Sequence, residues 1–259
     1  MITSRSISAI KQRAREMASP IPVEQVLETL HKILPLLGSQ SHSRQMVNRI
    51  GYTLLTGKIA IVAPSCPDYA HHLGQYTFAG VGGGVPLLAQ VQIALLERLA
   101  VYLPKATFEI VVADQEADDS AMCHKVRKTR EEMLDLIEGS VQAVHAVVAS
   151  RGWSVHHMTE RFPELRQLEG AFSTRIAADA SLEARILSST ISRQSMYAQI
   201  GTFTREEMIA RTVRVAAQYC AMAHLSCRDG FMICNHETVN LSWYTEQGAT
   251  VLHNAVSVY

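Results

Sequence analysis

The chain has 259 residues, of which 47% are hydrophobic, and its 24 Lys and Arg residues balance its 24 Asp and Glu residues. A net charge of zero excludes a global field that would attract nucleic acid or a membrane, so any nucleic-acid surface would have to be a local patch. Five cysteines without a CxxC pair argue against a disulfide framework or a zinc ribbon, and the absence of a membrane-length apolar run or a signal core predicts a cytoplasmic protein with reduced thiols.

The first 57 residues predict a helical segment packed on the core. Residues 1–19 place four basic residues among small ones and predict a basic, partly frayed lead-in: Arg5, Lys11, Arg13 and Arg15. Apolar residues recur at helical spacing from Pro22 to Leu37, where Gly38 is a natural stop. A second helix is expected over roughly 42–55.

A short apolar run, Ile59 to Ala63, follows and predicts a fully buried strand, which Pro64 and Pro67 would end. Four polar or reactive residues come directly after it: Ser65, Cys66, Asp68 and Tyr69. In an open α/β sheet, ligands bind at the carboxyl ends of the strands. These residues are therefore candidates for a nucleophile and its surroundings, the alternative being an ordinary strand-to-loop turn.

The remaining chain alternates helices and strands. The order strand, helix (Val85–Leu103), strand (Thr107–Ala113) predicts a parallel pair with a right-handed crossover. Two capping boxes, Thr129 with Glu132 and Thr204 with Glu207, predict helices to about Ser150 and His224. Residues 160–200 are expected to be mostly helical, and three further strands are expected at Trp153–Met158, Gly230–Cys234 and Ala249–Val258.

This alternation predicts an α/β chain. We expect a Rossmann-like three-layer domain over residues 58–259, with a mainly parallel sheet of about five strands flanked by helices. Together with the helical segment 1–57 it would form one structural domain.

A glycine cluster precedes the helix that begins near Val85. Gly82 and Gly83, within Gly80–Gly84, could present backbone N–H groups to a phosphate, or the segment could be a flexible loop. The cluster does not complete a dinucleotide fingerprint and lies too far from the preceding strand. The chain also lacks a P-loop sequence, which excludes P-loop ATP chemistry.

An acidic turn follows the second strand and contains four carboxylates: Asp114, Glu116, Asp118 and Asp119. One interpretation is a solvated loop that also caps a helix. Another is a pocket for a cationic ligand, a ribose-binding acid, or a divalent-metal site, for which the residues alone fix no geometry.

The strand Gly230–Cys234 leads directly into Asn235, His236 and Glu237. If the strands are parallel, these residues fall at the same sheet edge as Ser65. A serine, a histidine and a carboxylate at one edge would supply a nucleophile and acid–base groups. Elsewhere the histidines lack metal-binding spacing, and most are expected to be hydrogen-bonded or at the surface.

Several of these segments together resemble the cyclodipeptide synthases, whose fold is similar to the catalytic domain of class I aminoacyl-tRNA synthetases. Ile61-Val-Ala-Pro-Ser65 stands where that family has its catalytic serine, after the first core strand. Glu237 and Tyr259 stand at places similar to a glutamate and a strand-closing tyrosine of the family. The region Lys125–Arg130 resembles the family's basic, tRNA-binding helix.

The resemblance has departures. Position 233 is isoleucine where the family has tyrosine, and Cys66-Pro-Asp-Tyr69 replaces the family's Asn-Ser-Tyr-Phe run. These differences suggest a divergent branch. The arginine-using branch is a candidate, because Asp114 and Glu116 could hold a guanidinium if the extended backbone continues past the strand.

The resemblance implies acyl transfer from aminoacyl-tRNA, with no cofactor and no ATP. Ser65, or less favourably Cys66, would be the nucleophile, with Glu237, His236 and Tyr259 as catalytic partners. Substrate-binding residues would be Asp114, Glu116, Asp68, Tyr69, Asn235, Gly82 and Gly83, and tRNA would bind Lys125, Arg127, Lys128 and Arg130. Two rivals remain: a nucleotide- or S-adenosylmethionine-dependent transferase using Gly80–Gly84 and Asp114, and a non-catalytic binding module.

Overall fold

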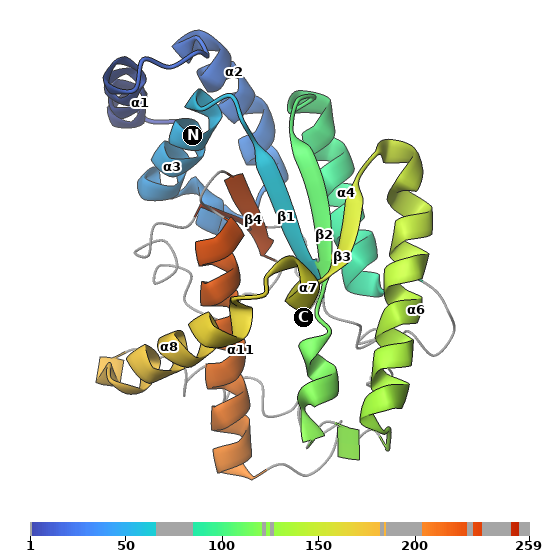
Figure 1. Ribbon diagram of the computed structural model, residues 1–259. Helices are drawn as coiled ribbons and strands as arrows, with labels where there is room; N and C mark the ends of the chain where they lie inside the picture. Colours follow the sequence, from blue (N-terminus) through green and yellow to red (C-terminus); the bar gives the residue numbers. More distant parts are fainter. Residues whose placement is uncertain are drawn as a thin grey trace.

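A five-stranded, all-parallel sheet forms the centre of the protein (Figure 1). The computed structural model describes residues 2–65, 85–120, 123–124, 127–181, 184, 204–226, 230–234 and 250–253. The strands run in the order β3-β2-β1-β4-β5. They are β1 (Ala60–Ser65), β2 (Thr107–Val112), β3 (Ser154–His157), β4 (Gly230–Cys234) and β5 (Val251–His253). The predicted α/β, Rossmann-like fold class is confirmed.

Burial explains why these segments are strands. Ile61, Val62 and Ala63 of β1 are at most 2% exposed, and the apolar residues of β2 and β4 are similarly buried. A strand covered on both faces reads as a continuous apolar run, which is the pattern of parallel sheets. The register places Ala63 beside Ile110 and Ile61 beside Phe231.

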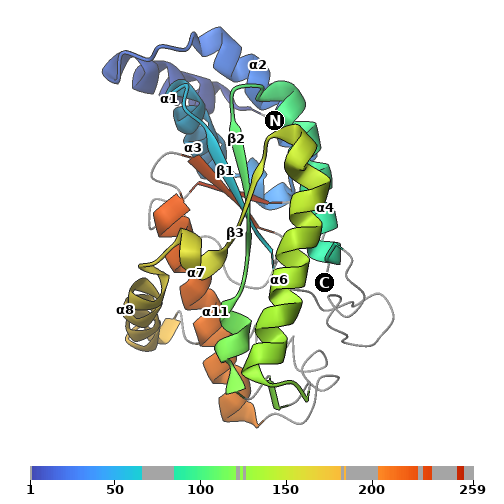
Figure 2. The same cartoon turned by 45° about the vertical axis from the view of Figure 1, so that its right-hand side comes forward.

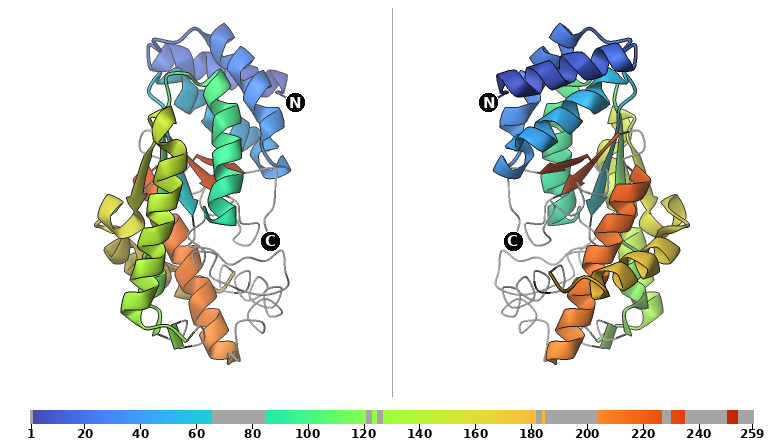
Figure 3. Two further views of the ribbon diagram at one scale, coloured as in Figure 1. Left: turned by 90° about the vertical axis from the view of Figure 1, so that its right-hand side faces the viewer. Right: turned by 90° about the vertical axis from the view of Figure 1, so that its left-hand side faces the viewer.

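Helices cover both faces of the sheet (Figures 2 and 3). The helices α4 (Leu87–Tyr102) and α6 (Arg130–Val148) lie on one face, and α11 (Arg205–Ser226) lies on the other together with α8 (Leu165–Ala177). The short helix α7 (Met158–Arg161) follows β3 directly. Both predicted capping boxes are present, since Thr129 and Glu132 cap α6 while Thr204 and Glu207 exchange the same pair of bonds at α11.

The expectation of a frayed lead-in over residues 1–19 is wrong. Residues Ser4–Glu16 form helix α1, whose N-cap Thr3 accepts a hydrogen bond from the Ser6 amide. Ile10 of α1 is fully buried against Gly51 of α3 (Arg44–Leu55), where an added Cβ would lie 2.6 Å from the Ile10 Cδ1 atom. Close packing against a glycine therefore anchors α1.

The helix α2 (Val23–Ile33) and two 3-10 turns, η1 (Leu34–Leu36) and η2 (Ser39–His42), complete the amino-terminal part. In Figure 1 the helices α1 to α3 gather at the end of the sheet where β1 begins. One hydrophobic cluster runs from Ile10 and Leu30 in these helices to Ile61 and Phe231 in the sheet. The described helices include none that combines the length and the apolar character that a membrane span requires.

Candidate functional site

The strand order reverses beside β1, which is the topological switch point of the sheet. β1 pairs with β2 as far as Ser65 and Val112, but its register with β4 ends at Val62 and Met232. β4 continues to Cys234 beside β5. The carboxyl ends of β1 and β4 therefore part, and in open α/β sheets the ligand crevice lies at this position.

Pro64 gives a physical reason for this separation. In a parallel ladder, alternate residues direct their backbone groups to alternate neighbours. The carbonyls of Ile59 and Ser65 accept hydrogen bonds from Thr107 and Ala113, at 2.9 and 2.8 Å, so these odd-numbered residues face β2. Pro64 must face β4, and it has no N–H to donate. The predicted strand end at Ala63 is wrong by two residues, since β1 continues past Pro64 to Ser65.

Gln92 of α4 supplies the Pro64 carbonyl with a hydrogen-bond donor that the neighbouring strand β4 does not. Its Nε2 donates a hydrogen bond to the Pro64 carbonyl oxygen. Gln92 is fully buried, and its Oε1 has no hydrogen-bond partner in the part of the chain that the structure describes. The amide thus holds the backbone immediately before Ser65. Sequence reasoning missed Gln92, although a polar residue within a strongly apolar helix is a signal that could have found it.

Ser65 lies where it was expected, at the carboxyl end of β1, and its side chain is fully buried. The other residues predicted to gather around it lie outside the described residues: Cys66, Asp68, Tyr69, Gly82, Gly83, Asn235, His236, Glu237 and Tyr259. Their convergence on Ser65 stays a prediction.

The acidic turn is not extended as expected. Gln115–Asp118 forms a 3-10 helix, in which residues two apart point in different directions, so the argument that aligned Asp114 with Glu116 fails. Asp114 accepts a hydrogen bond from the Thr159 amide at 3.0 Å and another from the Thr159 hydroxyl. Its carboxylate therefore holds the first turn of α7. The Glu116 side chain is not among those that the structure describes.

The other two carboxylates of this turn bind arginines of the chain itself. Asp118 accepts from Arg130 Nε at 2.9 Å and from Arg166 Nη2. The Asp119 carboxylate lies 3.7 Å from Arg214 of α11. This part of the turn therefore ties α6, α8 and α11 together at the carboxyl edge of the sheet.

Within the predicted tRNA-binding segment, the described residues 127–129 are not helical. Arg127 occupies a turn with φ of +55° and is exposed. Lys128 lies 3.9 Å from Glu132, and Arg130 pairs with Asp118. Lys125 falls outside the described residues. Of the three described cations, two already have carboxylate partners, which weakens their attraction for phosphate.

Two adjacent histidines on the edge strand β3 have separate partners, as expected for neighbouring strand residues. His156 lies 3.8 Å from Glu109, whereas His157 Nε2 lies 2.8 Å from Glu138 of α6. Hydrogen bonds from His157 and then Gln142 lower the pKa of Glu138. Within the described ranges, no three His, Cys, Asp or Glu side chains gather as a metal site.

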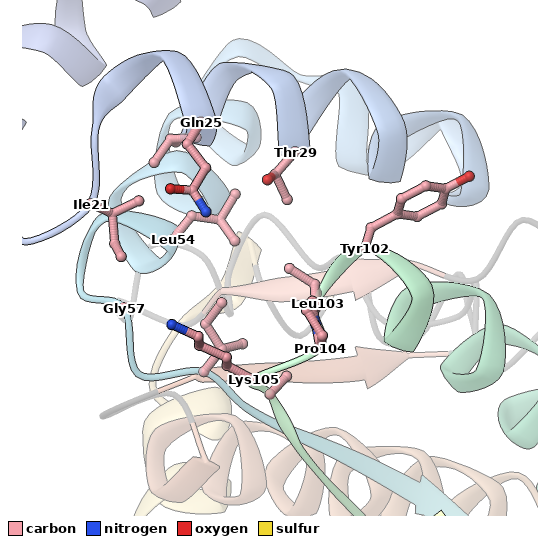
Figure 4. Close-up of a pocket in the computed structure, with 12 residues that line it drawn as sticks. Ile21, Gln25, Thr29, Leu54, Gly57, Tyr102, Leu103, Pro104 and Lys105 are labelled. Carbon is pink, nitrogen blue, oxygen red and sulfur yellow. The ribbon is translucent and has the colours of Figure 1, made fainter.

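A pocket of about 120 Å³ lies at the opposite, amino-terminal side of the sheet (Figure 4). Its walls come from α2, the turn at Gly57, the end of α4 and the segment that follows α4, including Gln25, Tyr102 and Lys105. None of the predicted site residues lines it.

The fold is similar to that of an aminoacyl-tRNA synthetase. The crystal structure of tyrosyl-tRNA synthetase complexed with L-tyrosine from Archaeoglobus fulgidus matches with a TM-score of 0.53 and 12% sequence identity. The match covers 88% of this chain and 64% of the synthetase chain, so this chain spans less than two thirds of that protein. At this identity the likeness shows the fold. No family model and no curated protein sequence matches.

Proposed function

We propose that the chain is an aminoacyl-tRNA-dependent acyltransferase of the cyclodipeptide synthase type, with Ser65 as its nucleophile. The observation that carries this proposal is the position of Ser65 at the end of β1, where β1 and β4 part at the switch point. The synthetase-like fold supports it, because that fold binds an amino acid in the cited relative. The sequence resemblance supplies the acyl-transfer chemistry.

In the proposed reaction the Ser65 hydroxyl attacks the ester carbon of an aminoacyl-tRNA. The serine oxygen forms the new ester bond, the bond to the tRNA breaks, and the tRNA hydroxyl receives a proton. The amino group of a second aminoacyl-tRNA then attacks the seryl ester, which forms a dipeptidyl-tRNA and releases the Ser65 hydroxyl. The free amino group of this dipeptidyl-tRNA attacks its own ester carbon, which closes the diketopiperazine ring and releases the second tRNA. Glu237 would hold the substrate ammonium or move a proton, with His236 and Tyr259 beside it.

The position of Ser65 also suits a nucleophile physically. The backbone before it is held by the proline ring of Pro64 and by the hydrogen bond from Gln92. A nucleophile fixed in this way loses little freedom on meeting the substrate, which favours reaction.

We further propose that one substrate amino acid is arginine, recognised at the acidic turn. Because Asp114 holds α7 and Asp118 holds two arginines, this role rests on Glu116. A guanidinium pairs with a carboxylate through two parallel hydrogen bonds, which a lysine ammonium cannot reproduce. Glu116→Gln should therefore reduce an arginine-containing product and leave the fold unchanged.

The experiment that tests the nucleophile is transfer of labelled amino acid from aminoacyl-tRNA to the protein. We expect stable label on the wild type and on Cys66→Ala, and none on Ser65→Ala. Mass spectrometry of medium from an expressing bacterial host should then detect a diketopiperazine absent from the empty-vector control. Label that survives Ser65→Ala but disappears in Cys66→Ala would assign the reaction to the cysteine.

The rival transferase function would use Gly80–Gly84 and Asp114 to bind a nucleotide or S-adenosylmethionine. The engagement of Asp114 by Thr159 disfavours it. A raised melting temperature with either ligand, which reports binding to the native state, would favour it instead.

A further inference from the structure

The neutral chain is divided into a basic and an acidic part. Residues 1–57 carry seven Lys and Arg residues against three Asp and Glu residues, a net charge of +4, so the remainder carries −4. Charge asymmetry of this kind indicates a surface that interacts with a polyanion.

Helix α1 contributes three exposed cations, Arg5, Lys11 and Arg15, which we call the α1 basic surface. At 3.6 residues per turn they fall within an arc of roughly 120°, away from the buried Ile10 and Ala14. The three side chains thus share one side of the helix.

These cations make no ion pair with any carboxylate in the described part of the chain, whereas Arg13 lies 3.6 Å from Glu16. The Arg15 Nε donates only to the Lys11 carbonyl, at 3.4 Å. Their charges therefore remain available to a partner. At the carboxyl edge, by contrast, Arg130 and Arg166 are bound to Asp118.

Helix stability does not explain the position of Arg5. The first turn of α1 contains Arg5 and no acidic residue, and the first turn of α3 begins with the exposed Arg44 and also lacks an acid. The helix macrodipole is positive at this end and disfavours a cation there. Arg15, in the last turn, is favoured by the dipole, but Arg5 and Arg44 are not.

The surface beside α1 is also concave. A hollow of about 510 Å³ lies between α1 and the start of α2, and Lys11, Arg15, Ser19 and Glu24 are among the residues that line it. Two of its polar groups are cations of the α1 basic surface. Such a hollow can admit the ridge of a phosphate backbone.

We propose that the α1 basic surface binds the sugar–phosphate backbone of the tRNA, an inference that rests on the proposed function. The surface lies at the end of the sheet opposite Ser65 (Figure 1). A six-residue strand is roughly 20 Å long, a distance that an RNA stem lying along the domain can span. An anionic membrane is a less suitable partner, because a helix that binds a membrane inserts its apolar face into the bilayer. The apolar side of α1 is already buried against α3.

The test compares tRNA binding by the full chain over a series of salt concentrations, using the wild type and the triple variant Arg5→Gln, Lys11→Gln, Arg15→Gln. The plot of log affinity against log salt should lose about one unit of slope per phosphate contact removed. Lys11→Gln alone is compared with Lys32→Gln, an exposed α2 lysine that pairs with Glu28 at 2.6 Å. We expect a weaker complex with the first and wild-type affinity with the second.

The outcomes separate this inference from the proposed function. If the wild type binds tRNA and the triple variant binds it with the same affinity and slope, the α1 basic surface is overturned and the proposed function stands. If the wild type binds no tRNA, both fall. If the triple variant loses binding to phosphatidylserine vesicles but keeps tRNA binding, the partner is a membrane and the inference is wrong.

Discussion

Replacing Asp114 by alanine should destabilise the protein by about 2 kcal/mol, because its carboxylate accepts two hydrogen bonds from Thr159 at the start of α7. A hydrogen bond to a charged group contributes about 1.5–3 kcal/mol, and we count the two bonds as one because the contact is only half-buried and water can partly replace it. For a chain of this size, that loss lowers the melting temperature by roughly 4–8 °C.

The variant Asp114→Asn is the matched control. The asparagine Oδ1 can still accept from the Thr159 amide, and its Nδ2 can donate to the Thr159 hydroxyl. The loss of charge should therefore cost less than about 1 kcal/mol. Because the native carboxylate is already engaged, we also expect Asp114→Asn to keep the wild-type product.

Thermal and urea denaturation followed by circular dichroism measure the stability, and mass spectrometry measures the product. A melting temperature of Asp114→Ala equal to that of the wild type would refute the structural role of this contact. If Asp114→Asn instead kept the stability and lost an arginine-containing product, Asp114 itself would recognise the substrate.

Three other local contacts can each be tested by substitution. Gly230→Ala should prevent stable folding, because the added Cβ would overlap a carbonyl oxygen of β1. Gly139→Ala in α6 has open space around the added Cβ and should stabilise the protein by about 0.5–1 kcal/mol. Equal melting temperatures of the two variants would contradict this packing. Gln92→Leu should lower the rate of acyl transfer to Ser65 with little change in KM or melting temperature, because losing the donor to the Pro64 carbonyl oxygen is offset by removing the buried, unpartnered Oε1. An unchanged rate would show that Gln92 does not position the nucleophile. His157 lowers the pKa of Glu138, so this pair stabilises the fold above the carboxyl's ordinary pKa and loses that effect as the pH falls through the lowered pKa. Glu138→Gln should therefore reduce the free energy of unfolding by less than about 1 kcal/mol at neutral pH and not at all in acid. A difference in unfolding free energy that stays constant with pH would contradict the pairing.

Local sequence signals predicted the elements of the sheet well. The run of apolar residues in β1 and β2 is required by burial on both faces, and the capping box at Thr129 marks the start of α6 to the residue. Parallel strands follow from helical crossovers between them. The order of β3 and β5 at the two edges does not follow from local patterns, because it depends on which distant strands pair.

Side-chain partners far apart in sequence could not be predicted. Nothing near Asp114 shows that its carboxylate would bind Thr159, 45 positions later. The same is true of Gln92 and Pro64, which are 28 residues apart. The predicted strand end failed at Pro64 because proline usually interrupts a ladder, whereas here it interrupts only the pairing with β4 and leaves the pairing with β2 intact as far as Ser65.

The arrangement of charge pairs decides where a polyanion can bind, and net charge does not. At the carboxyl edge, Arg130, Arg166 and Arg214 are drawn to Asp118 and Asp119, and a phosphate would have to displace these carboxylates. At the amino edge, Arg5, Lys11 and Arg15 of α1 form no ion pair with the described carboxylates. A phosphate that meets an unpaired cation gains the full attraction and releases counterions, whereas one that breaks an ion pair exchanges one partner for another. For the same reason, a dense basic run such as Lys125–Arg130 predicts a polyanion-binding surface less well than isolated arginines at helix starts do, because no internal contact accounts for the charge of those arginines.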